Sequence, residues 1–173
     1  LLSYYMLAPR KVLLPQIGVS RMSKRNDDAE SVHVATDDRA LEIGRAMHAR
    51  DTVAQNLGVI LEEVRAGYAR VSMPVGEHML NGHGTAHGGY SFMLADMAFS
   101  YACNSHGQMA FAQSAHITYM TFGRLGEVLT AISEEKSSAG RSGVYDSTVY
   151  GEDGRVVAEF RGLSRTVKGR VET

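Results

Sequence analysis

Apolar residues occupy every face of one stretch of the chain, residues 92–103. At 3.6 residues per turn this stretch leaves no polar stripe, so the pattern predicts a long helix that is buried on nearly all sides. Asp96 is the only charged residue between Gly88 and Asn104. Because an ionised group is costly to bury unless it is paired or opens on a cleft, Asp96 is the first candidate for chemistry.

The stretch before this helix predicts one more helix and a pair of strands. Thr36, Asp37 or Asp38 can cap a helix that ends at Gly58. Its inward apolar positions are expected to be Leu41, Ile43, Met47, Val53 and Leu57. Residues 59–64 and 68–75 then have the composition of strands, with a turn at residues 66–67 between them.

Four further extended segments follow the buried helix, at residues 113–122, 127–137, 142–151 and 155–167. Glycine-containing turns separate them at 123–126, 138–141 and 152–154. The order is one helix, two strands, a long buried helix and four strands. This order predicts an α+β fold in which an antiparallel sheet of about six strands wraps the buried helix.

Residues 1–36 are predicted to be an N-terminal extension, and residues 1–21 within it show neither helical nor strand periodicity. We expect a disordered or added extension here, with Met22 as a candidate native start, although a targeting leader or an arm that wraps a partner stays open. Residues 37–168 are expected to form one domain and residues 169–173 a short tail. A chain of 173 residues, 44% of them hydrophobic, is long enough for one well-buried domain.

Composition restricts the function classes. A formal net charge of -1 gives no general attraction to nucleic acid or to an acidic membrane, and no apolar run approaches the roughly 20 residues of a membrane-spanning helix. Cys103 is the single cysteine, which excludes an internal disulfide and fits a reducing, cytoplasmic location. It lies in the apolar stretch, so we interpret it as a small core residue rather than a nucleophile.

The glycine pair before the buried helix is the second candidate for chemistry. Gly88 and Gly89 stand where the helix begins, so their backbone N–H groups are unpaired and lie at the positive end of the helix dipole. Glycine also leaves room for a ligand oxygen to approach the backbone. Alternatively, the pair only permits a tight junction between loop and helix.

The sequence of this region forms a long ordered motif, N-G-H-x-x-x-H-G-G-x-x-F-x-L-A-D-x-A-F-x-x-A-x-N-S-x-G, over residues 81–107. Together with G-V-Y-D at 143–146 and F-R-G at 160–162, it resembles the PaaI-type acyl-CoA thioesterases of the hotdog fold, named for phenylacetic acid degradation. The resemblance covers residues 47–168. It implies a central helix in a curled sheet, a homodimer that is commonly assembled into a homotetramer, and hydrolysis of an acyl-CoA without a metal or organic cofactor.

Thioester hydrolysis gives the candidate residues specific roles. The start of the helix at Gly88 can polarise the carbonyl, and Asp96 can act as a general base toward water or attack the carbonyl to form a mixed anhydride. Eight residues separate Gly88 from Asp96, which is about 12 Å along one helix and too far for both to act on one carbonyl. We therefore expect the helix start of one subunit to face Asp96 of another across a homodimer.

Weaker assignments complete the predicted site. Ser100 lies one turn after Asp96 and can orient it or the attacking water. The resemblance implies that Asn81 is a polar residue near the thioester, whereas His87 is better interpreted as structuring the loop. Gly89 is expected to contact the substrate. Arg124 and Arg141 are candidates for the phosphates of coenzyme A, although solvated surface charge is the simpler interpretation of each.

Several alternatives stay open at this level. Asp96 can be a core carboxylate bonded to a backbone turn or a tyrosine. His78, His83, His87 and His106 can suggest a metal site, but no cysteine or second carboxylate completes a usual zinc set, so we expect no metal. A hydratase or dehydratase acting on a CoA thioester and a non-catalytic acyl-CoA binding module are the competing functions. The acyl group itself, whether phenylacetyl, hydroxyphenylacetyl or medium-chain, is left undecided.

Overall fold

The structure, a computed structural model, describes residues 37–173, so the expectations for residues 1–36 lie outside the described part. In chain order the elements are α1 (Asp37–Arg50), α2 (Thr52–Asn56), β1 (Ile60–Arg65), β2 (Tyr68–Pro74), the 3-10 turn η1 (Glu77–Met79), α3 (Gly88–Asn104), β3 (Gln108–Tyr119), β4 (Val128–Ala139), β5 (Ser142–Tyr150) and β6 (Val156–Arg170). The α+β order that the sequence predicted is therefore observed.

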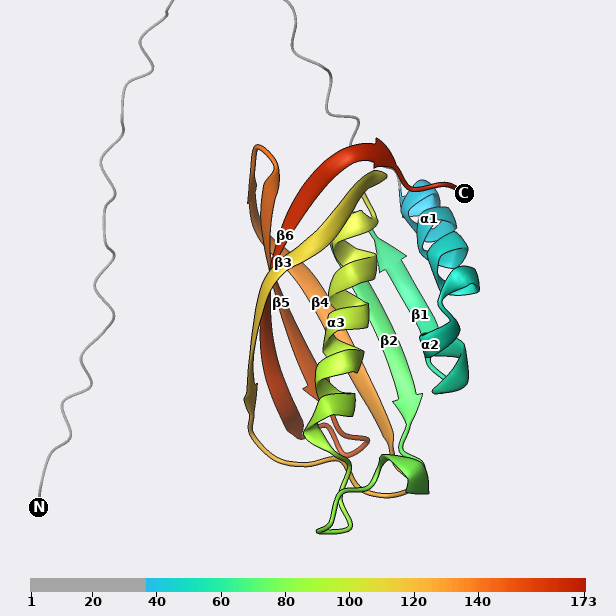
Figure 1. The fold of residues 1–173 in the computed structure, drawn as a ribbon, viewed down its shortest axis with the longest axis vertical. Helices are drawn as coiled ribbons and strands as arrows, with labels where there is room; N and C mark the ends of the chain where they lie inside the picture. Colours follow the sequence, from blue (N-terminus) through green and yellow to red (C-terminus); the bar gives the residue numbers. More distant parts are fainter. Residues whose placement is uncertain (1–36) are drawn as a thin grey trace, which may run out of the picture. The chain divides into compact units, whose positions relative to one another are not determined.

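The six strands form one antiparallel sheet in the order β1-β2-β4-β5-β6-β3. The sheet curls around α3, while α1 and α2 lie beside β1 (Figure 1). On β5 the buried residues alternate with half-buried ones from Gly143 to Tyr150, so one face of the strand points at the helix. β3 stands at the edge of the sheet, and its second edge has no partner strand within residues 37–173.

The buried helix is confirmed. Ten of the 17 residues of α3 are buried, which agrees with apolar positions on all of its faces. Phe99 packs against the rings of Tyr145 and Phe160, with centroid distances of 5.4 and 5.8 Å. A Cβ atom on Gly162 would lie 2.9 Å from the Phe99 ring, so the glycine of the F-R-G motif lets helix and sheet approach closely.

The predicted first helix is broken in two. Asp51 has an extended backbone, and its side chain accepts a hydrogen bond from Ala54 N–H at 2.9 Å, which ends α1 and caps α2. The break changes the direction in which later side chains point. Val53 is therefore 47% exposed, and its predicted inward orientation was wrong. Gly58 has φ +66° and ends this segment, as predicted.

Most predicted strands match the structure within one or two residues, but β3 and β6 differ more. β3 begins at Gln108, five residues before the predicted start, because Gly107 with φ +85° turns the chain out of α3 at once. It ends at Tyr119, and the next two N–H groups, of Met120 and Thr121, both donate to the carbonyl of Val157. β6 continues to Arg170, past the predicted end at 167.

No helix within residues 37–173 is both long enough and apolar enough to cross a membrane.

Candidate active site

Asn81 closes the loop that leads into α3. Its side-chain oxygen accepts from the N–H groups of His83 and Thr85 at 2.9 and 3.3 Å, and its amide nitrogen donates to the Thr85 hydroxyl at 3.0 Å. The backbone N–H of Asn81 also donates to the carbonyl of Thr85. The Asn81 side chain thus stabilises the loop before α3. Its predicted role toward the thioester stays a prediction.

The first turn of α3 leaves one glycine N–H without a partner. His87 is the N-cap, and its Nδ1 accepts the N–H of Gly89 at 3.2 Å, so His87 structures the helix start. Within residues 37–173 the N–H of Gly88 has no hydrogen-bond partner. A Cβ atom on Gly88 would stand 3.1 Å from the Tyr119 ring, so any larger residue here would push the ring away by a few tenths of an ångström. The N–H of Gly88 is therefore available to a ligand oxygen at the positive end of the helix.

Asp96 is half-buried in the middle of α3. Its carboxylate forms no hydrogen bond or ion pair with any residue that the structure describes, so within residues 37–173 no backbone turn or tyrosine satisfies it. Burial raises the pKa of Asp96 above the usual range of aspartate, because desolvation disfavours its charged form. A carboxylate that is partly desolvated and unpaired has the properties of a catalytic base or nucleophile.

A pocket of ≈ 580 Å³ lies beside this carboxylate, within the size range of small-molecule sites. From α3 it is lined by Asp96, Ser100 and Cys103, and the surrounding walls include the apolar side chains of Met109 and Phe111 on β3. The Ser100 hydroxyl has no hydrogen-bond partner in the described chain. Burial and the nearby Asp96 charge raise the pKa of the Cys103 thiol to about 12, which supports its interpretation as an unreactive core residue.

Sequence reasoning missed residues from the two ends of the domain that line the same pocket. Met47 and Arg50 come from α1, and Val171 and Glu172 follow β6. The Arg50 guanidinium donates to the backbone carbonyl of Glu172 at 2.9 Å and so joins the two ends. The inward position of Met47 was predicted, but no local pattern indicates that it faces Asp96.

The structure brings some of the predicted residues together and separates others. Asp96 and Ser100 line the same pocket. Gly88, Gly89, His87 and Asn81 instead lie at or before the start of the helix. The predicted phosphate ligands are also far apart, because Arg124 precedes β4 and Arg141 follows it.

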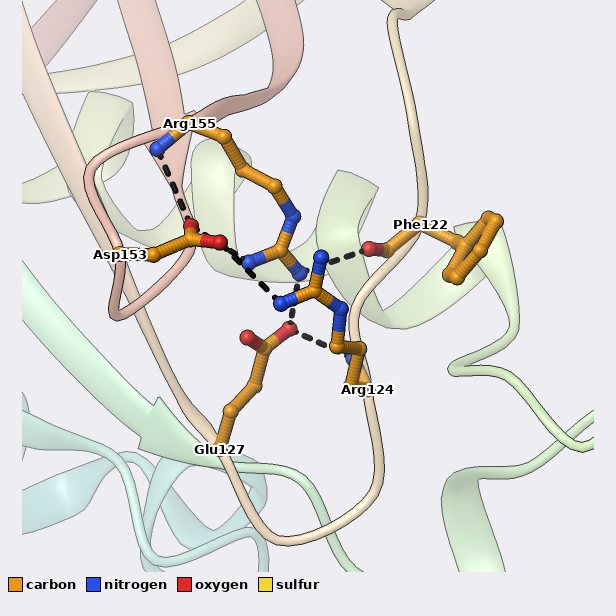
Figure 2. A network of polar contacts seen from close by, with 5 residues as sticks. All are labelled: Phe122, Arg124, Glu127, Asp153 and Arg155. Atoms are coloured by element: carbon orange, nitrogen blue, oxygen red, sulfur yellow. Dashed lines mark hydrogen bonds and ion pairs between the residues drawn. The ribbon is translucent and has the colours of Figure 1, made fainter.

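Both arginines have partners within the protein. Arg124 forms an ion pair with Asp153 at 3.1 Å (Figure 2), and Arg141 Nε donates to the carbonyl of Thr166 at 3.0 Å. Among residues 37–173, no three His, Cys, Asp or Glu side chains lie close enough together to hold a metal ion.

Comparison with known proteins connects this geometry to a family. Residues 83–158 match the model of the thioesterase superfamily. The acyl-coenzyme A thioesterase PaaI of Escherichia coli K12 is 38% identical over 133 residues, which are 77% of this chain and 95% of that protein. The chain belongs to the thioesterase superfamily.

Solved structures agree with this membership. The structure of E. coli PaaI, from the phenylacetic acid degradation operon, has 37% identity and a TM-score of 0.78, and the match covers 80% of this chain and 100% of that one. A hypothetical thioesterase from Streptococcus pneumoniae TIGR4, solved with coenzyme A, has 28% identity and a TM-score of 0.63 over 66% of this chain and 88% of that one. The PaaI-type resemblance and the hotdog fold are confirmed.

Membership of this superfamily makes the protein a thioester hydrolase. The comparisons thus favour hydrolysis over the hydratase or dehydratase reaction that the sequence left open.

Proposed function

We propose that the protein hydrolyses an acyl-CoA to a free acid and coenzyme A, with a phenylacetyl, hydroxyphenylacetyl or medium-chain acyl group. One observation supports this most: the unpaired, half-buried Asp96 opens on a largely apolar pocket of ≈ 580 Å³. The name of the E. coli relative and the coenzyme A bound to the streptococcal thioesterase support the same substrate class. The apolar walls suit an aryl or alkyl group, and the flexible Met47 and Met109 side chains suit more than one shape.

The proposed site is shared between two subunits. Gly88 and Asp96 are on one straight helix, about 12 Å apart along its axis. The exposed edge strand β3 offers the surface on which a second copy can pair, and large apolar side chains on and after it are exposed at Phe111, Tyr119, Met120, Phe122 and Leu125. Pairing of two β3 edges covers these groups and the free backbone edge. A two-fold dimer then contains two sites, and a pair of such dimers is the homotetramer that the resemblance implies.

Hydrolysis uses the start of α3 in one subunit and the middle of α3 in the other. The Gly88 N–H of one subunit donates to the thioester carbonyl oxygen, and this hydrogen bond strengthens as the oxygen becomes negative. Asp96 of the other subunit takes a proton from water, whose oxygen bonds to the acyl carbon. The C–S bond then breaks, and the coenzyme A thiolate recovers the proton. In the alternative route Asp96 bonds to the acyl carbon and expels the thiolate, and water hydrolyses the anhydride.

The remaining residues receive supporting roles. Ser100 orients the Asp96 carboxylate or the attacking water, because its free hydroxyl lines the same pocket. Gly89 contacts the substrate beside Gly88, and His87 holds the helix start in place. Asn81 positions water or the carbonyl. Of the two arginines, Arg124 is the better candidate for a coenzyme A phosphate, since its exposed pair with Asp153 can exchange partners.

Release of free thiol from a panel of acyl-CoAs tests the proposed function. The panel contains phenylacetyl-, 4-hydroxyphenylacetyl-, hexanoyl- and octanoyl-CoA, and a chromogenic disulfide reports the thiol. We expect turnover of at least one aryl or medium-chain substrate. Binding of these compounds without thiol release would contradict the proposal.

A charge in the middle of β3 is expected to split the dimer. When two copies of a strand pair around a two-fold axis, residues near its centre face their own copies, so Ser114→Asp places two carboxylates together. We expect light scattering to show a shift toward the monomer, and kcat to fall at low protein concentration. Ser137→Asp, also an exposed strand serine, is the control and should leave the mass unchanged. An unchanged mass for Ser114→Asp would place the dimer contact elsewhere.

A further inference from the structure

The loop between β3 and β4 lies directly against the start of α3. The N–H of Ala86 donates to the carbonyl of Gly123 at 2.9 Å, and a Cβ atom on Gly123 would stand 3.0 Å from the Cβ of Ala86. Just before the loop, the ring of Tyr119, the last residue of β3, packs on Gly88. Because the loop carbonyl of Gly123 bonds Ala86, two residues before α3, the position of the loop acts on the position of the helix start.

The loop is also held by a largely buried ion pair. Arg155, which directly precedes β6, donates from Nη2 to Glu127 Oε1 at 2.6 Å and to the carbonyl of Phe122 at 3.0 Å (Figure 2). The same Glu127 oxygen accepts the backbone N–H of Arg124. The two side chains are only 19% and 8% exposed, unlike the other arginine–carboxylate pairs on the surface. The loop is thus tied at its middle and at its end to one guanidinium.

The backbone around Glu127 extends the connection to β2. The carbonyl of Glu127 accepts the N–H of Val75 at 2.8 Å, and the N–H of Gly126 donates to the carbonyl of Val75 at 2.9 Å. Burial alone would raise the pKa of Glu127, but hydrogen bonds from Arg155 and from the Arg124 N–H hold it below its usual value. The pair is therefore ionised. Removing the Arg155 charge leaves Glu127 without its ion-pair partner, whereas without Glu127 the guanidinium keeps its ion pair with Asp153 at 2.7 Å but loses the bond that ties it to the end of the loop.

We infer that Arg155 and Glu127 are positioning residues: they fix the 120–127 loop, and through the hydrogen bond between the Gly123 carbonyl and the Ala86 N–H they fix the Gly88 N–H that faces the substrate. The effect of this pair on turnover rests on the proposed function of Gly88. The effect of the pair on the Ala86–Gly123 hydrogen bond is independent of that proposed function. The effect on turnover and the effect on this hydrogen bond can therefore be tested separately. Neither residue belongs to the motif around α3, and neither lines the pocket beside Asp96.

The variants are Arg155→Gln, Arg155→Lys and Glu127→Gln, with Arg161→Gln as the control. Arg161 also bonds a carboxylate, Asp146, through two nitrogens at 2.6 and 2.7 Å, but on the exposed face of the sheet. Lysine keeps the charge at 155 yet cannot reach Glu127 and the Phe122 carbonyl together, so Arg155→Lys should rescue activity only in part. Kinetics are measured well below the melting temperature of each variant.

We expect Arg155→Gln and Glu127→Gln to lower kcat about ten- to a hundredfold with little change in KM, because a small displacement of the Gly88 N–H weakens contact with the transition state. Hydrogen exchange should show faster exchange at the Ala86 amide in these variants and no change in Arg161→Gln. If both variants lose thermal stability but keep wild-type kcat and slow exchange at Ala86, the pair is merely structural and the inference is wrong. If the wild type released no thiol at all, the proposed function would fail, and the exchange measurement would still test the positioning.

Discussion

Asp96→Asn is expected to lower kcat by about two orders of magnitude or more on any acyl-CoA that the wild type hydrolyses. The amide has nearly the shape of the carboxylate but can neither take a proton from water nor attack a carbonyl. The exposed Asp38, outside the pocket, provides the control variant Asp38→Asn, which should keep full activity. Steady-state thiol release measures both, and near-normal turnover by Asp96→Asn would exclude the carboxylate from the chemistry.

The same substitution should not destabilise the fold. Burial raises the pKa of Asp96 in the folded protein, so the contribution of this group to stability is largest at low pH and is lost as the pH rises through that pKa. At neutral pH the ionised, partly desolvated carboxylate lowers the free energy of unfolding, and asparagine removes this destabilisation. We expect a melting temperature equal to or above that of the wild type. In the wild type, kcat should fall on the acid side at a pH above the usual range of aspartate, because protonation removes the base.

Gly88→Ala is the second substitution with a large expected effect. The added methyl group would stand 3.1 Å from the Tyr119 ring and beside the free N–H, so it obstructs both the packing and the approach of the carbonyl oxygen. Loss of one oxyanion donor costs about two to three orders of magnitude in kcat.

Gly82→Ala is the matched control for this substitution. This glycine belongs to the loop before α3, and a Cβ atom on it would have no neighbour within 4 Å. Circular dichroism checks that both variants fold, and thiol release measures kcat. If Gly88→Ala were as active as Gly82→Ala, the helix start would have no part in binding the carbonyl.

The central part of this fold was predictable because its signals are local. The apolar residues on all faces of α3 and the glycine turns between the strands each depend on a few neighbouring positions. The break at Asp51 also has a local cause, a side-chain cap, but the apolar spacing through Leu57 concealed it. The start of β3 was missed because Ala110 and Ala112 have low strand propensity and pair with β6 only through the folded sheet.

The site was predictable only where the motif carries it. Asp96 and the glycine at 88 stand out in the sequence, since one is a lone charge and the other begins a helix. Arg50 and Glu172 come from opposite ends of the domain and line the same pocket as Asp96. Arg155 bonds Glu127, which is 28 residues away in the sequence. Contacts of this kind follow from how the sheet curls around α3, so no short pattern reveals them.

The most direct test of a site shared between subunits is complementation. Asp96→Asn and Gly88→Ala chains are co-expressed in equal amounts, and thiol release is compared with that of each variant alone. In a mixed dimer, one site combines an intact Gly88 from the first chain with an intact Asp96 from the second. With random pairing about half of the dimers are mixed, and each mixed dimer has one intact site of two. The mixture is therefore expected to have about a quarter of the wild-type activity, although each variant alone is nearly inactive. If the mixture were no more active than its separate components, both groups would act within one chain, and the proposed arrangement would be wrong.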